Sequence, residues 1–279
     1  MKYRHRFHAG NFADVHKHVT LLALLAALQR KDKGFLYLET HAGRGSYDLR
    51  DATHARAALD GVARVLAAAA AAGAAPELVA YAAGVDAWRR ERASECAYPG
   101  SPLLAVRRLR PQDRALLLEL SREESSALAQ VLPVDARARV ECADGFEALR
   151  AHLPPRERRG LILIDPPYEE TAEDFARARR ALADGLRRFA TGVFALWYPL
   201  KDRRDLEGWK RQLATALDRE ALLSELWVHP CDSRVALNGS GIVIVNPPYQ
   251  LDTRMQQWLP ALHGLLDPEG SGGFALQAL

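Results

Sequence analysis

Short runs of apolar residues recur along the chain, and between them apolar and polar positions alternate with a helical period. A short apolar run that ends in Gly, Pro or an acid predicts a strand buried on both faces of a parallel sheet, and the periodic stretches predict helices that cover it. Alternation of the two indicates an α/β protein. The seven predicted strands are 35–39, 115–120, 139–142, 161–164, 192–199, 221–228 and 241–245.

The last two predicted strands are joined by a short loop that is rich in Asn, Gly and Ser. A parallel connection needs a crossover of about a dozen residues or more, usually a helix, so this loop predicts an antiparallel hairpin. The seventh strand therefore runs against the others, and its carboxyl end lies at the opposite edge of the sheet.

The pattern changes between residues 47 and 98, where alanine dominates and residues 67–72 are all alanine. Pro76 starts a second helical run there, because proline is favoured in the first turn of a helix. We predict a helical insertion subdomain over residues 47–98. The main domain is then formed by residues 1–46 and 99–279.

The composition is that of a globular protein, with 279 residues of which 48% are hydrophobic and 26% charged. The apolar run 21–28 is too short to span a bilayer, and no signal-peptide pattern precedes it. The three cysteines are far apart, so neither a disulfide framework nor a metal site is predicted. We expect a cytoplasmic protein without a membrane segment, and a monomer because no apolar repeat suggests an interface.

The net charge is only +3, but the 38 basic residues are mostly arginines that occur in clusters. Such clusters suit contact with phosphates, or they cover solvated helices. In the first eleven residues, aromatic and basic residues alternate. This segment either lies along a nucleic acid, with Tyr3 or Phe7 on a base, or is a tail pinned to the fold by its aromatic rings.

The strand at 161–164 runs directly into Asp165-Pro166-Pro167-Tyr168. Neither proline can donate to a strand ladder, so the segment predicts a rigid turn at the carboxyl end of a strand, where α/β sheets bind ligands. Asp165 and the carbonyl of Pro166 can accept hydrogen bonds, and Tyr168 offers a flat apolar face. This pattern is typical of amino-methyltransferases that modify adenine N6 or cytosine N4. The plainer interpretation is a strand and a proline turn capped by the acid.

A second copy of the pattern, Asn246-Pro247-Pro248-Tyr249, ends the seventh predicted strand. Because that strand runs backwards, its end lies away from the ligand-binding edge of the sheet. We therefore interpret Asn246 as a structural stop and Asp165 as the functional copy.

A glycine-rich turn at 40–46, which contains Gly43, follows the first strand, and acids follow the second and third strands. In nucleoside-binding sheets, an acid at the position of Glu119 accepts hydrogen bonds from both ribose hydroxyls. Asp144 can accept from an adenine amine, beside the backbone of Gly145. Each acid alone is more often a helix cap or a surface carboxylate, but together they predict a nucleoside pocket.

The first predicted helix begins after a cap at Asn11 or Asp14. Lys17 and His18 lie near its start, where they can face a carboxylate. A solvent-facing pair is the other interpretation. Ser101 either caps a helix or touches a ligand.

The order of these features resembles that of the Rossmann-like S-adenosylmethionine-dependent methyltransferases. This resemblance implies a seven-stranded methyltransferase sheet with an antiparallel seventh strand and a helical insertion after the first strand and its turn. Longer strings are similar to the RlmJ family, the bacterial large-subunit ribosomal RNA adenine-N6 methyltransferases, over nearly the whole chain. These strings are 3–5, 7–11, 35–38, 40–43, 98–102 and 159–169.

The resemblance implies transfer of a methyl group from S-adenosyl-L-methionine to N6 of a specific adenine in 23S rRNA, free or incompletely assembled. It also implies that Asp165 is the catalytic acid, assisted by Pro166 and Tyr168, and that Tyr3 contacts the RNA. The wider superfamily usually has an aromatic residue where His41 stands. The implied cofactor-binding residues are Lys17, His18, His41, Gly43, Ser101, Glu119, Asp144 and Gly145.

Three other functions are weighed against this one. A DNA adenine or cytosine amino-methyltransferase shares the tetrapeptide but more often carries a dedicated target-recognition region. An NAD-dependent dehydrogenase needs a Gly-x-Gly-x-x-Gly turn with an acid roughly twenty residues further on, and Asp48 and Asp60 fit that spacing badly. A non-catalytic RNA-binding module has no need for the three acids at the strand ends.

Overall fold

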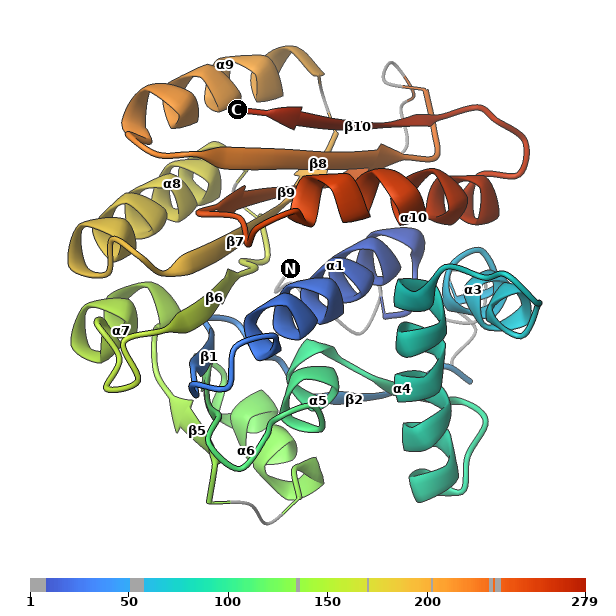
Figure 1. Ribbon diagram of the computed structural model, residues 1–279, viewed down its shortest axis with the longest axis horizontal. Coiled ribbons are helices and arrows are strands. Elements are labelled where there is room, and N and C mark those ends of the chain that lie inside the picture. Colours follow the sequence, from blue (N-terminus) through green and yellow to red (C-terminus); the bar gives the residue numbers. More distant parts are fainter. Residues whose placement is uncertain are drawn as a thin grey trace.

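The computed structural model describes residues 9–50, 58–133, 136–169, 171–201, 203–230, 233 and 237–279. Its centre is an eight-stranded sheet in the order β10-β8-β9-β7-β6-β1-β4-β5 (Figure 1). These strands are β1 (Leu36–Glu39), β4 (Arg114–Glu119), β5 (Ala138–Cys142), β6 (Gly160–Ile164), β7 (Val193–Leu200), β8 (Ala221–Trp227), β9 (Gly239–Val245) and β10 (Gly273–Ala278).

The strand directions agree with the sequence prediction for all seven predicted strands. β5, β4, β1, β6 and β7 pair in parallel, whereas β9 is antiparallel to both β7 and β8. The predicted hairpin and the Rossmann-like α/β class are therefore confirmed. The eighth strand, β10, pairs antiparallel with β8 at the edge of the sheet and was not predicted. Its residues are half-buried or exposed, so it lacks the apolar run that marks a buried strand.

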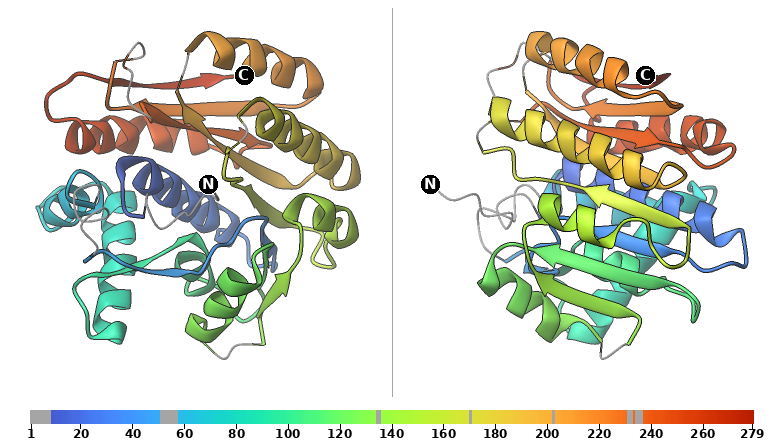
Figure 2. Two further views of the ribbon diagram at one scale, coloured as in Figure 1. Left: turned by 180° about the vertical axis from the view of Figure 1, so that it is seen from behind. Right: turned by 90° about the vertical axis from the view of Figure 1, so that its left-hand side faces the viewer.

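Helices cover both faces of the sheet. Side chains of a strand point alternately to opposite faces, so Leu161 and Leu163 enter one core while Ile162 and Ile164 enter the other. α1, α3, α4, α5 and α10 lie on the first side and α7, α8 and α9 on the second (Figures 1 and 2). The helices are α1 (Phe12–Gln29), α3 (Val62–Ala69), α4 (Pro76–Arg92), α5 (Ser101–Val106), α6 (Arg122–Val131), α7 (Gly145–His152), α8 (Thr171–Arg188), α9 (Arg203–Ala216) and α10 (Leu251–Leu266).

α1 is the helix that matters most for the site, because it is buried on nearly all sides. The side chain of Asn11 caps it by accepting a hydrogen bond from the backbone N–H of Asp14 at 2.9 Å. The helix packs against α4, α5, α10 and β9. Its polar residues Asp14, His16, Lys17 and His18 are consequently all inside the protein.

The segment predicted as a helical insertion holds α3 and α4, but its two ends form strands. β2 (Ser46–Asp48) and β3 (Ala97–Pro99) pair antiparallel in a small second sheet. α3 and α4 pack on each other and on α10, α4 also packs on α1, and side chains of both helices share the core beneath α1. Treating residues 47–98 as a separate subdomain stays a prediction.

The structure confirms Asn246 as a structural stop. The carboxyl end of β9 pairs with the amino end of β7, so Asn246 lies at the edge away from the carboxyl ends of the parallel strands. Its side-chain amide donates to the carbonyls of Ala190 at 2.9 Å and Gly192 at 2.7 Å. Tyr249 of this second motif is 79% exposed.

Within the described residues, no helix is both long and apolar enough to cross a membrane. The same part of the chain contains no group of three or more His, Cys, Asp or Glu side chains arranged to hold a metal ion. Cys96 and Cys142 are free thiols, and Cys231 lies outside the described residues.

Candidate active site

The carboxyl ends of β1, β4, β5 and β6 meet at one edge of the sheet, because these strands are parallel neighbours. The glycine-rich turn follows β1, Glu119 ends β4, Asp144 follows β5 and Asp165 follows β6. The topology thus brings the predicted acids and the turn to the edge where α/β sheets bind ligands.

The glycine-rich turn is held in place by Glu119. The backbone N–H of Gly43 donates to Oε2 of Glu119 at 2.8 Å, and the N–H of Ser121 donates to Oε1 at 2.8 Å. Gly43 has a φ of +62°, and a Cβ there would come within 2.7 Å of the Tyr47 hydroxyl. Burial raises the pKa of Glu119. Each carboxylate oxygen keeps a second lone pair, so Glu119 can still accept hydrogen bonds from ribose hydroxyls.

Asp144 caps α7 and faces an arginine of α8. Its Oδ1 accepts from the backbone N–H groups of Phe146 at 2.9 Å and Glu147 at 3.3 Å, and its Oδ2 lies 3.2 Å from Nη2 of Arg177. A Cβ on Gly145 would come within 1.9 Å of the carbonyl oxygen of Thr40. Only glycine therefore lets the start of α7 pack against the end of β1.

His41 lies between these two features. Its ring meets the ring of Phe146 edge-on, with centroids 4.8 Å apart, and its Nδ1 lies 2.7 Å from the hydroxyl of Thr40. Burial lowers the pKa of His41 to about 4, so the ring is neutral near pH 7. A neutral ring in this position offers a polar edge without a charge.

Ser101 points at a buried acid that the sequence interpretation did not include in the site. Its hydroxyl donates to Oε1 of Glu39 at 2.5 Å, and the hydroxyl of Tyr37 donates to Oε2 at 2.8 Å. Glu39 is 0% exposed, and burial raises its pKa from 4.5 to about 7, although Ser101, Tyr37 and Lys17 act to lower it. The available signal was an acid at the end of a buried strand, directly before the glycine-rich turn.

We expect Glu39 to make the protein less stable as the pH rises. A carboxyl whose pKa is higher in the folded than in the unfolded state favours the folded protein at low pH, and this contribution is lost between pH 4.5 and about 7. A pKa shift of this size corresponds to about 3 kcal/mol in the free energy of unfolding. Denaturant unfolding between pH 5 and 8 should show that Glu39→Gln removes this part of the pH dependence. The exposed control Glu269→Gln should leave the dependence as it is in the wild type.

Lys17 joins the catalytic candidate to a second buried acid. Its Nζ lies 2.6 Å from Oδ2 of Asp165 and 2.9 Å from Oδ1 of Asp14. The three side chains are only 4%, 9% and 2% exposed, respectively. Burial by itself would lower the pKa of Lys17, but the two carboxylates outweigh it and hold the pKa well above its ordinary value. The sequence interpretation considered Asp14 only as a cap, and the solvent-facing alternative for Lys17 is wrong.

His18 lies inside the core. The alternative interpretation that it faces solvent is therefore wrong, as it is for Lys17. Its side chain is 0% exposed, and its ring stacks on that of Tyr98 with the centroids 5.8 Å apart. Nδ1 lies 2.9 Å from the Tyr98 hydroxyl, and Nε2 lies 3.4 Å from Oδ1 of Asp14. A contact between His18 and a cofactor stays a prediction.

The turn after Asp165 places Pro166 in a buried position and folds Tyr168 back against aromatic neighbours. Tyr168 has a φ of +51° and is 3% exposed, and its hydroxyl donates to the carbonyl of Trp197 at 2.6 Å. Its ring lies 4.6 Å from that of Phe175 and 5.8 Å from that of Trp197. Stacking of Tyr168 on a base stays a prediction, since its ring is buried in this structure.

Trp197 is the aromatic end of β7 that lies beside the acid. Nζ of Lys17 is 5.9 Å from the centroid of its ring, and its indole N–H donates to the hydroxyl of Ser240 at 2.9 Å. The ring of His16 lies between the hydroxyls of Ser240 and Ser224, at 3.0 Å from each. Burial lowers the pKa of His16 to about 3, so this support is uncharged.

Most predicted site residues thus meet at one edge. Asp165 contacts Lys17, Gly43 contacts Glu119, and Gly145 packs on the strand end that carries His41. Among the described residues, Ser101 is linked to them through Glu39. Tyr3 lies outside the described residues.

Comparison with known proteins shows the family to which the chain belongs. A family model described as "Ribosomal RNA large subunit methyltransferase D, RlmJ" matches residues 32–278. Two relatives, both named ribosomal RNA large subunit methyltransferase J, come from Escherichia coli (strain K12) and Haemophilus influenzae. The first is 43% identical and the alignment covers 98% of this chain and 96% of the relative. The second is 39% identical, with 99% and 98% covered.

A solved structure has the same fold over almost its whole length. It is a crystal structure of a protein from Legionella pneumophila str. Philadelphia 1 that is 34% identical to this chain. The superposition has a TM-score of 0.87 and covers 97% of this chain and 98% of the other. The family match and the two relatives lead to one conclusion: the chain belongs to the RlmJ family of ribosomal RNA large subunit methyltransferases.

Proposed function

We propose that the protein transfers a methyl group from S-adenosyl-L-methionine to N6 of a specific adenine in 23S rRNA, giving N6-methyladenosine. The observation that carries this proposal is the carboxylate of Asp165, held by Lys17 in an Asp-Pro-Pro-Tyr turn at the carboxyl end of β6. Membership of the RlmJ family supports the substrate class.

The residues at the sheet edge fit S-adenosylmethionine. Glu119 has acceptor capacity left for ribose hydroxyls, and Asp144 has capacity left for an adenine amine. Gly43 and Gly145 bring the backbone close, and the uncharged polar edge of the His41 ring can contact the cofactor. When bound, S-adenosylmethionine supplies an electrophilic methyl group on a sulfonium.

Asp165 is placed to receive the amine that is methylated. Lys17 occupies Oδ2, and within the described part of the chain no donor reaches Oδ1. An exocyclic amine of adenine is a poor nucleophile because its lone pair is delocalised into the ring. Hydrogen bonds from that amine to Oδ1 and to the carbonyl of Pro166 would favour a tetrahedral nitrogen. Fixing the nitrogen in this way contributes to the rate by orientation.

The target adenine has to leave its helix or loop to reach this edge of the sheet. Trp197 and Tyr168 then supply the aromatic surface beside Asp165, and Lys17 keeps the carboxylate in position. Tyr3 is proposed to contact the RNA. We take the protein to act as a cytoplasmic monomer on free or incompletely assembled 23S rRNA.

The substrate class is tested by methyl transfer from labelled S-adenosylmethionine to three nucleic acids in parallel. We expect label in 23S rRNA and none in 16S rRNA or duplex DNA. Label in duplex DNA with unlabelled 23S rRNA would assign the protein to the DNA amino-methyltransferases instead.

A further inference from the structure

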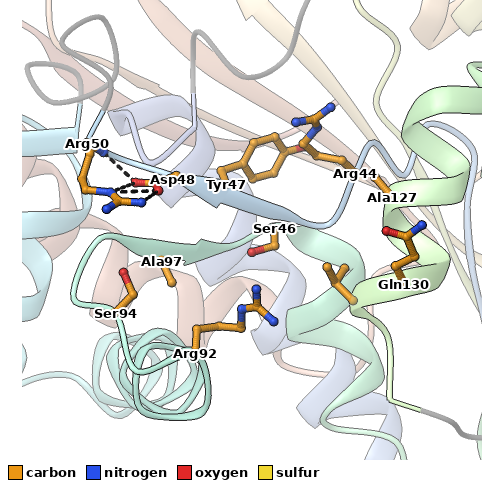
Figure 3. A pocket seen from close by; sticks show the side chains of 11 residues that line it. Arg44, Ser46, Tyr47, Asp48, Arg50, Arg92, Ser94, Ala97, Ala127 and Gln130 are labelled. Atoms are coloured by element: carbon orange, nitrogen blue, oxygen red, sulfur yellow. Dashed lines mark hydrogen bonds and ion pairs between the residues drawn. The ribbon is translucent and has the colours of Figure 1, made fainter.

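A pocket lies between the two-stranded β2–β3 sheet, α4 and α6, and none of the acids of the site described above lines it (Figure 3). Its volume is about 710 Å³, within the range of pockets that bind small molecules. It is lined by Arg44, Ser46, Tyr47, Asp48, Arg50, Arg92, Ser94, Ala97, Ala127, Gln130 and Val131.

Three arginines reach this pocket from three parts of the chain. Arg44 belongs to the glycine-rich turn, Arg50 follows β2, and Arg92 ends α4. Asp48 is the only acid among the lining residues. Hydroxyl and amide groups of Ser46, Ser94 and Gln130 complete a lining that is rich in hydrogen-bond donors.

The three guanidinium groups differ in whether a carboxylate of the protein already pairs with them. Arg44 is held by Glu124 through two hydrogen bonds of 2.9 Å each. Arg50 pairs with Asp48, but these side chains are 74% and 50% exposed, so solvent screens the pair and it adds little to stability. Arg92 has no carboxylate within salt-bridge distance in the described part of the chain; its guanidinium lies 5.7 Å from the ring centroid of Trp88.

Trp88 is the buried aromatic residue against which the guanidinium of Arg92 packs. Its side chain is 1% exposed, and its indole N–H donates to the hydroxyl of Ser46 at 3.1 Å. Arg92 is exposed and points toward Ser46 across the pocket in Figure 3. A guanidinium that has no carboxylate partner and lies beside hydroxyl donors is complementary to a phosphate group in geometry and charge.

The pocket lies close to the proposed cofactor site, where the backbone of an RNA substrate can reach it. Arg44 stands between Gly43 and Gly45, so the pocket adjoins the back of the proposed cofactor turn. An rRNA whose adenine enters at Asp165 extends well beyond that base, and its backbone carries one negative charge per nucleotide. Phosphate contacts of this kind position an RNA without reading its sequence.

We propose that this pocket binds a phosphodiester group of the rRNA substrate away from the target adenine, with Arg92 as its principal cation. This inference rests on the proposed function for the identity of the RNA.

The test compares the salt dependence of RNA binding in charge-matched variants. One lost phosphate contact lowers the slope of log K against log salt by about 0.7–0.9, and at 0.1 M salt it weakens binding roughly three- to tenfold. We expect Arg92→Gln to show both changes with a 23S rRNA fragment, and Arg92→Lys to keep the wild-type slope. The control is Arg211→Gln on α9, at the opposite end of the molecule in Figure 1, which should change neither quantity.

RNA binding is measured directly as well as through KM, so the result does not depend on catalysis. Binding of S-adenosylmethionine and the melting temperature show that each variant is folded. An unchanged salt slope in Arg92→Gln, with methyl transfer intact, would overturn the pocket assignment and leave the proposed function standing. Wild-type protein that binds 23S rRNA without methylating it would count against the proposed function alone.

Discussion

Asp165→Ala is expected to lower kcat for methyl transfer to 23S rRNA by roughly 10²–10⁴-fold, the usual range for loss of a group that handles a proton. The variant loses the carboxylate at the carboxyl end of β6 that we propose accepts a hydrogen bond from the target amine. Asp165→Asn keeps one acceptor oxygen, so we expect a smaller loss. Single-turnover rates with saturating S-adenosylmethionine measure both.

The matched control for this pair is Asp252→Ala, an exposed acid in the first turn of α10. Its transfer rate should equal that of the wild type. Binding of S-adenosylmethionine by Asp165→Ala, followed by calorimetry, shows whether the cofactor site has survived. Transfer by Asp165→Ala within tenfold of the wild-type rate would rule out Asp165 as the catalytic acid.

Lys17→Met is expected to lower both stability and methyl transfer. Methionine keeps most of the apolar stem but leaves Asp14 and Asp165 buried without their shared cation. Breaking a buried pair in this way costs about 3–5 kcal/mol. The pKa of Lys17 lies well above its ordinary value of 10.5, so the contribution of the charged lysine is fully present below pH 10.5 and is lost only as the pH rises through the higher pKa.

Lys210→Met separates the structural from the functional part of this effect. Lys210 also lies between two carboxylates, at 2.9 Å from Glu207 and 2.8 Å from Glu225, but on the other side of the sheet. We expect it to lose stability in urea unfolding, and less than Lys17→Met because Glu207 is exposed. Its transfer rate should remain that of the wild type at a temperature where it is folded. Equal losses of transfer in both variants would mean that Lys17 acts only through stability.

Most of the strands that the sequence predicted are those whose burial is visible locally; β5, which is half-buried or exposed along its length, is the exception. β6 is buried at all five positions and reads as a continuous apolar run, and β9 is equally buried. β10 was missed because an edge strand with one exposed face has no such run. β2 and β3 were missed because each is three residues long and depends on its partner across a 48-residue gap.

The site residues also divide into those that the local sequence predicts and those that depend on how distant elements pack. Glu119, Asp144 and Asp165 were predictable because each lies at or just after the end of a strand, and parallel strands end at one edge. Asp14 and Lys17 are three residues apart on one helix, a spacing at which side chains meet, so their contact could have been predicted. The burial of the pair could not, since it depends on α1 being enclosed by four other elements. Glu39 was missed although it ends a predicted strand directly before the glycine-rich turn, because the sequence does not show that its carboxyl is completely buried.

The measurement that tests the central claim most directly is identification of the methylated nucleoside. 23S rRNA is incubated with wild-type protein and labelled S-adenosylmethionine, then digested to nucleosides and separated. The proposed function predicts that the label is found in N6-methyladenosine, at one position, and that it is absent with Asp165→Ala. Label in a ribose methyl, in a ring-carbon methyl or in N4-methylcytidine would contradict it.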